Sequence, residues 1–213
     1  SLSFVCSLGL IAAMPAYALD ASKIISKDTS SATIIDLFSG FWKKGETDDA
    51  IDLLKYAAEQ GNSFAQWRLG LFYARGHQGL ERDHLAAFRM FEKVAAKYPL
   101  ARPGTANWKI SSDALVALGN YYRKGIPGTI VVPDRNMAQM MYTTAAMMFR
   151  NSVAQFELGR MQLHDAHLFG QSHLGIQNLS LASQKGHVGA QALLGYAIFE
   201  GVHTQHDPVK GLI

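Results

Sequence analysis

The stretch that decides the fold runs from Ala57 to Gly76 and reads AAEQGNSFAQWRLGLFYARG. Its pattern of a Leu-Gly pair with an alanine four positions before the leucine recurs three more times, after steps of 49, 40 and 36 residues. Self-similarity on this scale predicts a solenoid built from helix-turn-helix repeats, with insertions lengthening the earlier copies. The recurring residues are Ala65, Leu69, Gly70, Ala114, Leu118, Gly119, Ala154, Leu158, Gly159, Ala190, Leu194 and Gly195.

The spacing within the motif predicts α-helices. Ala65, Leu69, Phe72 and Tyr73 fall on one apolar stripe that would face a partner helix. A glycine inside a helix costs about 1 kcal/mol relative to alanine, so we expect the glycine after each leucine to permit close approach of two backbones. A second glycine, seven residues after the leucine, is predicted to end the helix, except in the third copy, which has Asp165 there. We therefore predict an all-α, right-handed α-solenoid.

The first 18 residues have the pattern of a secretory signal peptide. An uncharged apolar run from Leu2 to Met14 precedes a small-x-small sequence, which predicts export and cleavage between Ala18 and Leu19. The basic region expected ahead of such a run is absent, so we expect the sequence to start inside the signal. A buried N-terminal helix is the alternative interpretation. A membrane span is disfavoured because the run is shorter than the ~20 residues that a bilayer needs.

After the predicted leader the chain contains no cysteine, which excludes thiol catalysis and thiolate metal sites. Residues 19–32 are polar and are predicted to form a flexible lead-in. Residues 33–213 are predicted to form one repeat domain, and a last helix starting at Asp207-Pro208 indicates a fifth repeat that is cut short. The net charge of +3 is mild and the basic residues are scattered, so nucleic-acid binding is not expected.

Helix starts and loops divide the predicted domain. The expected helix N-caps are Thr47 or Asp48, Asp83, Asp134 and Ser172. Two insertions, at residues 98–112 and 125–133, are rich in proline and glycine and are predicted to be loops. Such loops often carry function on repeat scaffolds. The alternative is that Trp108 and residues 130–132 pack over helix ends.

The histidines are the candidates for metal or proton binding. His164, His167 and His173 form one group, and His203 and His206 form another, but no carboxylate set completes a recognisable site. We therefore predict no metal and no cofactor. Each histidine could gain charge between about pH 5 and 8, so proton sensing is a hypothesis beside the alternative of solvated turn histidines. Nucleophile-elbow, phosphate-loop and zinc-protease motifs are absent, which predicts that the protein is not an enzyme.

The repeat unit resembles the Sel1-like repeat, a relative of the tetratricopeptide repeat, from about Thr47 to the end of the chain. Residues 38–45, 114–127 and 154–161 also resemble the ExoR family of periplasmic negative regulators of exopolysaccharide production. The resemblance implies a periplasmic protein that holds a membrane sensor histidine kinase of a two-component system in its off state, and so affects polysaccharide synthesis and motility. It implies the periplasmic domain of that kinase as partner, with no small-molecule substrate and with membrane contact only through the partner.

Large aromatic and arginine side chains carry much of the binding energy at protein interfaces. We therefore expect partner binding by Trp67, Arg68, Trp108, Tyr121, Arg123 and Lys124. Packing between repeats is the competing interpretation for Trp67 and Tyr121. The methionines of residues 137–148 are interpreted as an adaptable binding strip or as core. Two other functions stay open. One is a cell-envelope scaffold that regulates no kinase, and the other is a hydrolase, as proposed for some Sel1-repeat proteins. Those proteins are rich in paired cysteines, which this chain lacks after the predicted leader.

Overall fold

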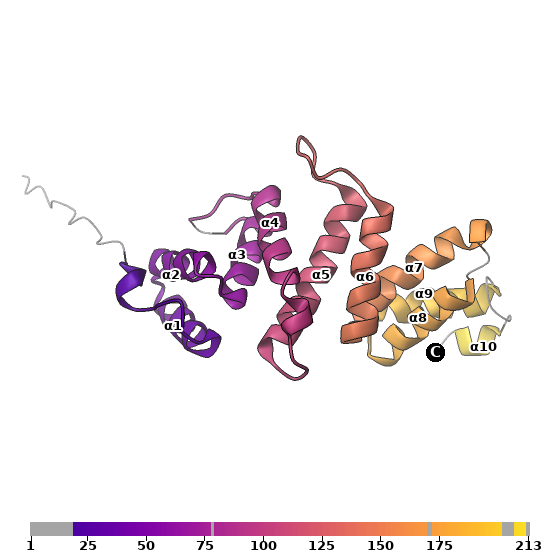
Figure 1. Ribbon diagram of the computed structural model, residues 1–213. Coiled ribbons are helices and arrows are strands. Elements are labelled where there is room, and N and C mark those ends of the chain that lie inside the picture. Colours follow the sequence, from indigo (N-terminus) through magenta and orange to yellow (C-terminus); the bar gives the residue numbers. More distant parts are fainter. Residues whose placement is uncertain (1–18, 78, 170–171, 202–206, 212–213) are drawn as a thin grey trace, which may run out of the picture.

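A computed structural model describes residues 19–77, 79–169, 172–201 and 207–211, and these residues form an elongated array of helices (Figure 1). The described residues contain no β-strand, so the predicted all-α solenoid is confirmed. In chain order the elements are η1 (Ala21–Lys23), α1 (Ser31–Lys44), α2 (Thr47–Glu59), α3 (Ser63–Arg75), α4 (His84–Ala95), η2 (Tyr98–Leu100), α5 (Ala106–Lys124), α6 (Arg135–Phe149), α7 (Ser152–Phe169), α8 (Ser172–Gln184), α9 (Val188–Glu200) and α10 (Pro208–Gly211).

The Leu-Gly motif marks the first helix of each helix pair, which we name the A helix; the helix that follows is the B helix. The A helices are α3, α5, α7 and α9, and each packs on its own B helix, α4, α6, α8 or α10. The motif alanines Ala65, Ala114, Ala154 and Ala190 are all fully buried. The leucines Leu69, Leu118 and Leu158 are buried and Leu194 is half-buried.

In the first two pairs, the motif glycine makes room for an aromatic ring. A Cβ atom added at Gly70 would lie 2.8 Å from the ring of Phe91 on α4. One added at Gly119 would lie 2.5 Å from the ring of Tyr142 on α6. Real Cβ contacts do not approach so closely, because side chains in a core are already at van der Waals distance. The expectation of close backbone approach is therefore wrong for these two glycines.

In the last two pairs, the glycine does bring two backbones together. A Cβ atom at Gly159 would lie 2.9 Å from the carbonyl oxygen of Gly175 on α8. At Gly195 it would lie 2.8 Å from the carbonyl oxygen of Gly211 on α10. Here the expectation is confirmed, and the compensation for glycine's low helix propensity is close helix packing.

In the α3–α4, α5–α6 and α9–α10 pairs, the same main-chain hydrogen bond closes the loop from the A helix to the B helix. The residue before the B helix donates its N–H to the carbonyl oxygen of the fourth residue after the motif leucine. The bonds run from Asp83 to Tyr73, from Asp134 to Tyr122 and from Asp207 to Ile198. The Asp83 and Asp134 carboxylates also cap their helices. Asp83 accepts from the N–H of Ala86 at 2.8 Å, and Asp134 accepts from the N–H of Met137 at 2.9 Å. These two predicted caps are confirmed.

The A helices end as their glycines predict. Gly76, Gly125 and Gly201 follow α3, α5 and α9 with φ near +70°, a conformation that suits glycine. The third copy has Asp165 at this position, and α7 runs on to Phe169. The missing glycine thus corresponds to a longer helix.

Other local predictions need correction. Thr47 and Asp48 lie inside the first turn of α2, whose N-cap is Glu46. Residues 106–112 of the expected first loop are helical, because Thr105 caps α5 by accepting from the N–H of Trp108. In the segment expected to be a flexible lead-in, Ala21 and Ile25 are buried.

The proposed signal peptide, residues 1–18, lies outside the described residues, as does its last residue, Ala18. Leu19, the residue after the proposed cleavage point, packs against the main core.

The turns that lead into the A helices α3, α7 and α9 also recur. Gly61, Arg150 and Gly186 occupy equivalent positions with φ of 88°, 52° and 79°. The next residue caps the A helix: Asn62 and Asn151 accept through their side-chain oxygens, and His187 accepts through Nδ1. The two asparagines also donate to serines of the preceding repeat, Ser31 and Ser112. Neighbouring repeats are therefore joined by polar contacts as well as by the core.

The buried apolar residues of the described chain form a main cluster, from Ile25 to Met161, and a smaller one around Leu179, Ala182 and Ala190. The second cluster belongs to the last repeats of the array. Each repeat thus depends chiefly on its neighbours, as in other solenoids.

Candidate protein-binding groove

A groove of ≈ 750 Å³ lies where α3, α4 and α5 meet. The three helices adjoin one another in the array, and the loop from α5 to α6 projects beyond the ends of these two helices (Figure 1). The lining residues are Leu71, Ala74, Arg75, His84, Phe91, Ala117, Asn120, Tyr121, Arg123, Lys124, Gly125, Ile126, Pro127 and Glu157. They come from the A helices α3, α5 and α7, the B helix α4 and the loop from α5 to α6, so only the folded array assembles them.

The apolar part of the groove is built around Tyr121. Its ring packs edge-on against Phe88, with centroids 6.0 Å apart, and lies 6.4 Å from the ring of Phe91. Its hydroxyl lies 3.2 Å from Nδ1 of His84. Burial, with a smaller effect of Asp83, raises the pKa of Tyr121. Tyr121 is therefore both a packing residue and a lining residue of the groove.

The polar end of the groove is built around Arg123. Burial raises the pKa of Tyr142, and the nearby Arg123 guanidinium opposes that shift. The Tyr142 hydroxyl donates to Oδ1 of Asn120 at 2.9 Å. Nε of Arg123 is buried and has no hydrogen-bond acceptor among the described residues. A buried donor without an acceptor costs free energy, whereas the rest of the half-buried Arg123 side chain lines the groove.

One carboxylate lines the groove, and it is already paired. Oε2 of Glu157 accepts from Arg160 at 2.6 Å, both residues being on α7. Within the described chain, Arg75, Arg123 and Lys124 have no carboxylate within ion-pair distance. The groove therefore presents net positive charge.

Three of the six residues expected to bind a partner, Tyr121, Arg123 and Lys124, line this groove. The other three pack within the scaffold. The Arg68 guanidinium lies over the rings of Phe38 and Phe72, at 5.2 and 5.0 Å, and burial lowers its pKa.

The two tryptophans of the expected set also pack on the scaffold. Trp67 lies 6.3 Å from the ring of Phe64, and Trp108 lies 4.3 Å from that of Phe149. The binding role of all six residues stays a prediction.

Sequence reasoning missed Arg75, Phe91 and Glu157. A signal existed for Arg75, because it precedes the helix-ending Gly76 as Lys124 precedes Gly125. Phe91 and Glu157 lie on other helices, and no local pattern relates them to Tyr121.

The second predicted loop separates the groove from a neighbouring hollow of ≈ 450 Å³, which contains Glu81, Arg82 and Asp83. Ile126 and Pro127 line both. Val131 is buried, whereas Ile130 and Val132 are 86% and 65% exposed. The loop thus packs down at Ile126 and Val131 and exposes the apolar side chains on either side of Val131.

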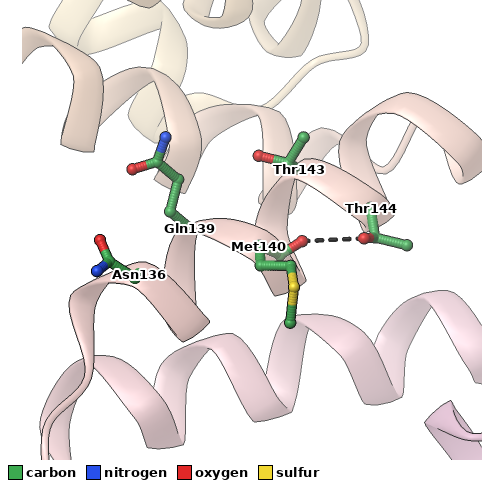
Figure 2. A pocket seen from close by; sticks show the side chains of 5 residues that line it. All are labelled: Asn136, Gln139, Met140, Thr143 and Thr144. Carbon is green, nitrogen blue, oxygen red and sulfur yellow. Dashed lines mark hydrogen bonds between the residues drawn. The ribbon is translucent and has the colours of Figure 1, made fainter.

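A shallow hollow of ≈ 350 Å³ lies on α6 and is lined by Asn136, Gln139, Met140, Thr143 and Thr144 (Figure 2). Thr144 Oγ1 donates to the Met140 carbonyl at 2.9 Å, a bond within the helix. Met140, Met147 and Met148 are exposed, whereas Met137 and Met141 are half-buried. Part of the methionine strip is therefore on the surface, but its hollow carries no charged group.

The histidines do not assemble a metal centre in the part of the chain that is described, where no group of three potential ligands occurs. His164 and His173 lie on α7 and α8. The side chain of His167 and residues 203 and 206 lie outside the described part. Among the described helices, none combines the length and hydropathy required to cross a bilayer.

The Sel1 repeat family pattern matches residues 43–62, 63–98, 112–148, 152–187 and 188–213. The crystal structure of a Sel1 repeat protein from Oxalobacter formigenes is similar, with a TM-score of 0.67 and 26% identity, over 86% of this chain and 69% of that one. The chain therefore belongs to the Sel1-repeat family.

Within that family, two relatives are similar over most of their length. The exopolysaccharide production negative regulator of Rhizobium meliloti is 32% identical over 198 residues, which cover 93% of this chain and 73% of the relative. The regulator of the same name from Rhizobium leguminosarum bv. viciae is 32% identical over 193 residues, covering 89% and 70%. The resemblance to the ExoR family is thereby confirmed.

Proposed function

We propose that this protein is a periplasmic negative regulator of exopolysaccharide production that acts by binding and repressing a membrane sensor histidine kinase. The observation that carries the proposal is the similarity to two exopolysaccharide production negative regulators over about nine-tenths of the chain. Repression of the kinase would lower output of its two-component system, and so lower polysaccharide synthesis and maintain motility.

The fold supports action by binding rather than by catalysis. Solenoids present extended concave surfaces to protein partners. The groove combines apolar lining, arginine and tyrosine, the residue types that dominate binding energy at interfaces. The polar side chains at its end are held by a tyrosine-asparagine hydrogen bond and an ion pair, and no nucleophile-base pair was identified there.

Export is the first step to test. The full-length protein is expressed in its host with a C-terminal tag, and the mature N-terminus is sequenced from the periplasmic fraction. Cleavage after Ala18 would place Leu19 at the new N-terminus. A protein that retains the apolar run, or that fractionates with the cytosol, would contradict the periplasmic part of the proposal.

Regulation is tested in a strain that lacks the gene. We expect deletion to raise exopolysaccharide and reduce swimming, and the full-length protein to restore both. Periplasmic cross-linking followed by affinity capture should then recover a sensor histidine kinase. A version without the leader serves as control and should capture none.

The outcomes separate the proposal from a cell-envelope scaffold. Recovery of envelope proteins without a kinase, with two-component output unchanged by the deletion, would replace the regulator by the scaffold. Unchanged exopolysaccharide in the deletion strain would overturn regulation of polysaccharide as well.

A further inference from the structure

The groove between α3, α4 and α5 combines three cationic side chains with an apolar lining. We infer that it binds an extended peptide segment that carries carboxylate side chains between apolar ones, supplied by the protein partner. This inference rests on the proposed function for the identity of the partner, but the chemistry of the segment follows from the groove alone.

Charge gives the first part of the argument. Arg75, Arg123 and Lys124 bring three cations to the groove, and Glu157, the one lining carboxylate, is neutralised by Arg160. A cleft with charge of one sign and apolar walls concentrates ligands of the opposite sign. The complementary segment is therefore acidic.

The position of Arg123 gives the second part. Arg123 lines the groove beside the Asn120–Tyr142 pair, and no carboxylate of the described chain lies within ion-pair distance of it. A carboxylate satisfies an arginine donor with a charge-assisted hydrogen bond, which is stronger than a neutral one. We therefore place one acidic side chain of the segment against Arg123.

The apolar lining gives the third part. Leu71, Ala74 and Ala117 offer carbon surface, and the Ile126-Pro127 wall borders it. In the loop that forms this wall, Ile130 is 86% exposed. Such a surface matches aliphatic or aromatic side chains, and hydroxyl-rich saccharide would leave it unmatched. This favours an acidic peptide over an acidic polysaccharide.

The test uses the purified mature protein and fluorescein-labelled dodecapeptides of alternating glutamate and leucine. Matched probes replace each glutamate by glutamine or lysine, and an oligogalacturonate serves as the saccharide probe. Fluorescence anisotropy is measured in low and moderate salt. We expect the glutamate peptide to bind about tenfold more tightly than the glutamine peptide, with affinity falling as salt rises.

Two variants locate the binding. Arg123→Gln is expected to weaken binding of the glutamate peptide about tenfold, the loss typical of one charge-assisted hydrogen bond. Lys124→Gln changes an exposed residue and is expected to weaken binding in a salt-dependent way without affecting folding. Arg102→Gln, an exposed arginine outside the groove, is the matched control and should leave binding unchanged.

Equal binding of glutamate and glutamine peptides would overturn the inference, as would equal losses in Arg102→Gln and Lys124→Gln. Binding of oligogalacturonate without peptide binding would replace the peptide by an acidic saccharide. Kinase capture separates this result from the proposed function. Capture by the wild type and equally by Lys124→Gln and Arg123→Gln would reject the groove and keep the regulator. If the peptide binds but the wild type captures no kinase, the peptide-binding groove is kept and the proposed repression of a kinase is rejected.

Discussion

At the scale of single residues, the four motif glycines have one sequence signature but two physical roles. Gly70 and Gly119 each face an aromatic ring, whereas Gly159 and Gly195 each face a main-chain carbonyl. In every case the space that a Cβ atom would need is already filled. The low helix propensity of glycine is therefore offset by packing that alanine would disrupt.

Gly119→Ala is expected to lower the free energy of unfolding by about 1–3 kcal/mol, because the new methyl group would overlap the fully buried ring of Tyr142. Gly40→Ala is the matched control. Gly40 lies inside α1 with no atom within 4 Å of an added Cβ, so alanine there should stabilise the protein by up to about 1 kcal/mol. Urea unfolding followed by circular dichroism measures both. Equal effects of the two substitutions would contradict this explanation.

The sequence predicted where these glycines fall but not what they contact. A period of 36 to 49 residues locates equivalent positions, and the apolar stripe identifies the buried face. The contact partner is decided by the register of the B helix. Phe91 and Tyr142 reach their glycines from the facing helix of the pair. Local spacing therefore could not predict that these glycines contact an aromatic ring instead of a neighbouring backbone.

At the scale of elements, the turns between repeats differ in one residue. Gly61 and Gly186 adopt positive φ without steric cost, but Arg150 adopts the left-handed conformation between α6 and α7. A side chain with a Cβ atom pays for that conformation. Lys185, directly after α8, donates to the Arg150 carbonyl, as Lys97 donates to that of Gly61. Tertiary contacts thus hold Arg150 in place.

Arg150→Gly is expected to raise the free energy of unfolding by about 0.5–1 kcal/mol, because relief of the left-handed strain exceeds the entropy that glycine adds to the unfolded chain. The reciprocal change, Gly186→Ala, should lower it by about 1 kcal/mol. Thermal unfolding of the two variants and the wild type provides the comparison. A lower melting temperature for Arg150→Gly would show that its side chain contributes more than its backbone costs.

Helix starts were predicted correctly where a capping residue directly precedes a helical pattern of apolar residues. Asp83 and Asp134 precede clear apolar stripes, and both cap their helices. The prediction of Thr47 or Asp48 as N-cap was wrong because several polar residues stand in a row there and any of them can precede a helix. The N-cap is Glu46, so α2 begins at Thr47. The start of α5 was missed because Pro103 and Gly104 suggested a long loop, whereas Thr105 directly after them caps the helix.

At the scale of the whole molecule, the array is a linear chain of contacts. Leu54 on α2 belongs to the main cluster, and Leu179 on α8 belongs to the smaller one; both are fully buried. Replacing a buried leucine with alanine removes about 2–5 kcal/mol of stability. In a solenoid that loss acts mainly on adjacent repeats.

Leu54→Ala should therefore speed amide hydrogen exchange in α1 to α3 more than in α7 and α8, and Leu179→Ala should give the opposite profile. Hydrogen exchange read by mass spectrometry of peptic fragments resolves the two ends. The same increase at both ends in both variants would mean that the array unfolds as a single cooperative unit.

Half of the expected binding residues line the groove because they lie near the end of one A helix, beside the insertion that builds its wall. The sequence could relate Tyr121, Arg123 and Lys124, which are neighbours on α5. It could not relate them to Arg75, Phe91 and Glu157, which lie on α3, α4 and α7 and approach α5 only when these helices pack. The aromatic residues Trp67 and Trp108 pack on the scaffold, since large side chains serve cores as well as interfaces.

The hydrogen bond that closes the loops of the α3–α4, α5–α6 and α9–α10 pairs has an evolutionary consequence. Asp83, Asp134 and Asp207 return to the same point of the preceding helix, although their loops differ in length and composition. Both ends of the loop are thereby fixed, and residues between them can be lengthened or exchanged without moving the helices. Such a position tolerates insertion, so new recognition segments can diversify there while the repeats that carry them stay constant.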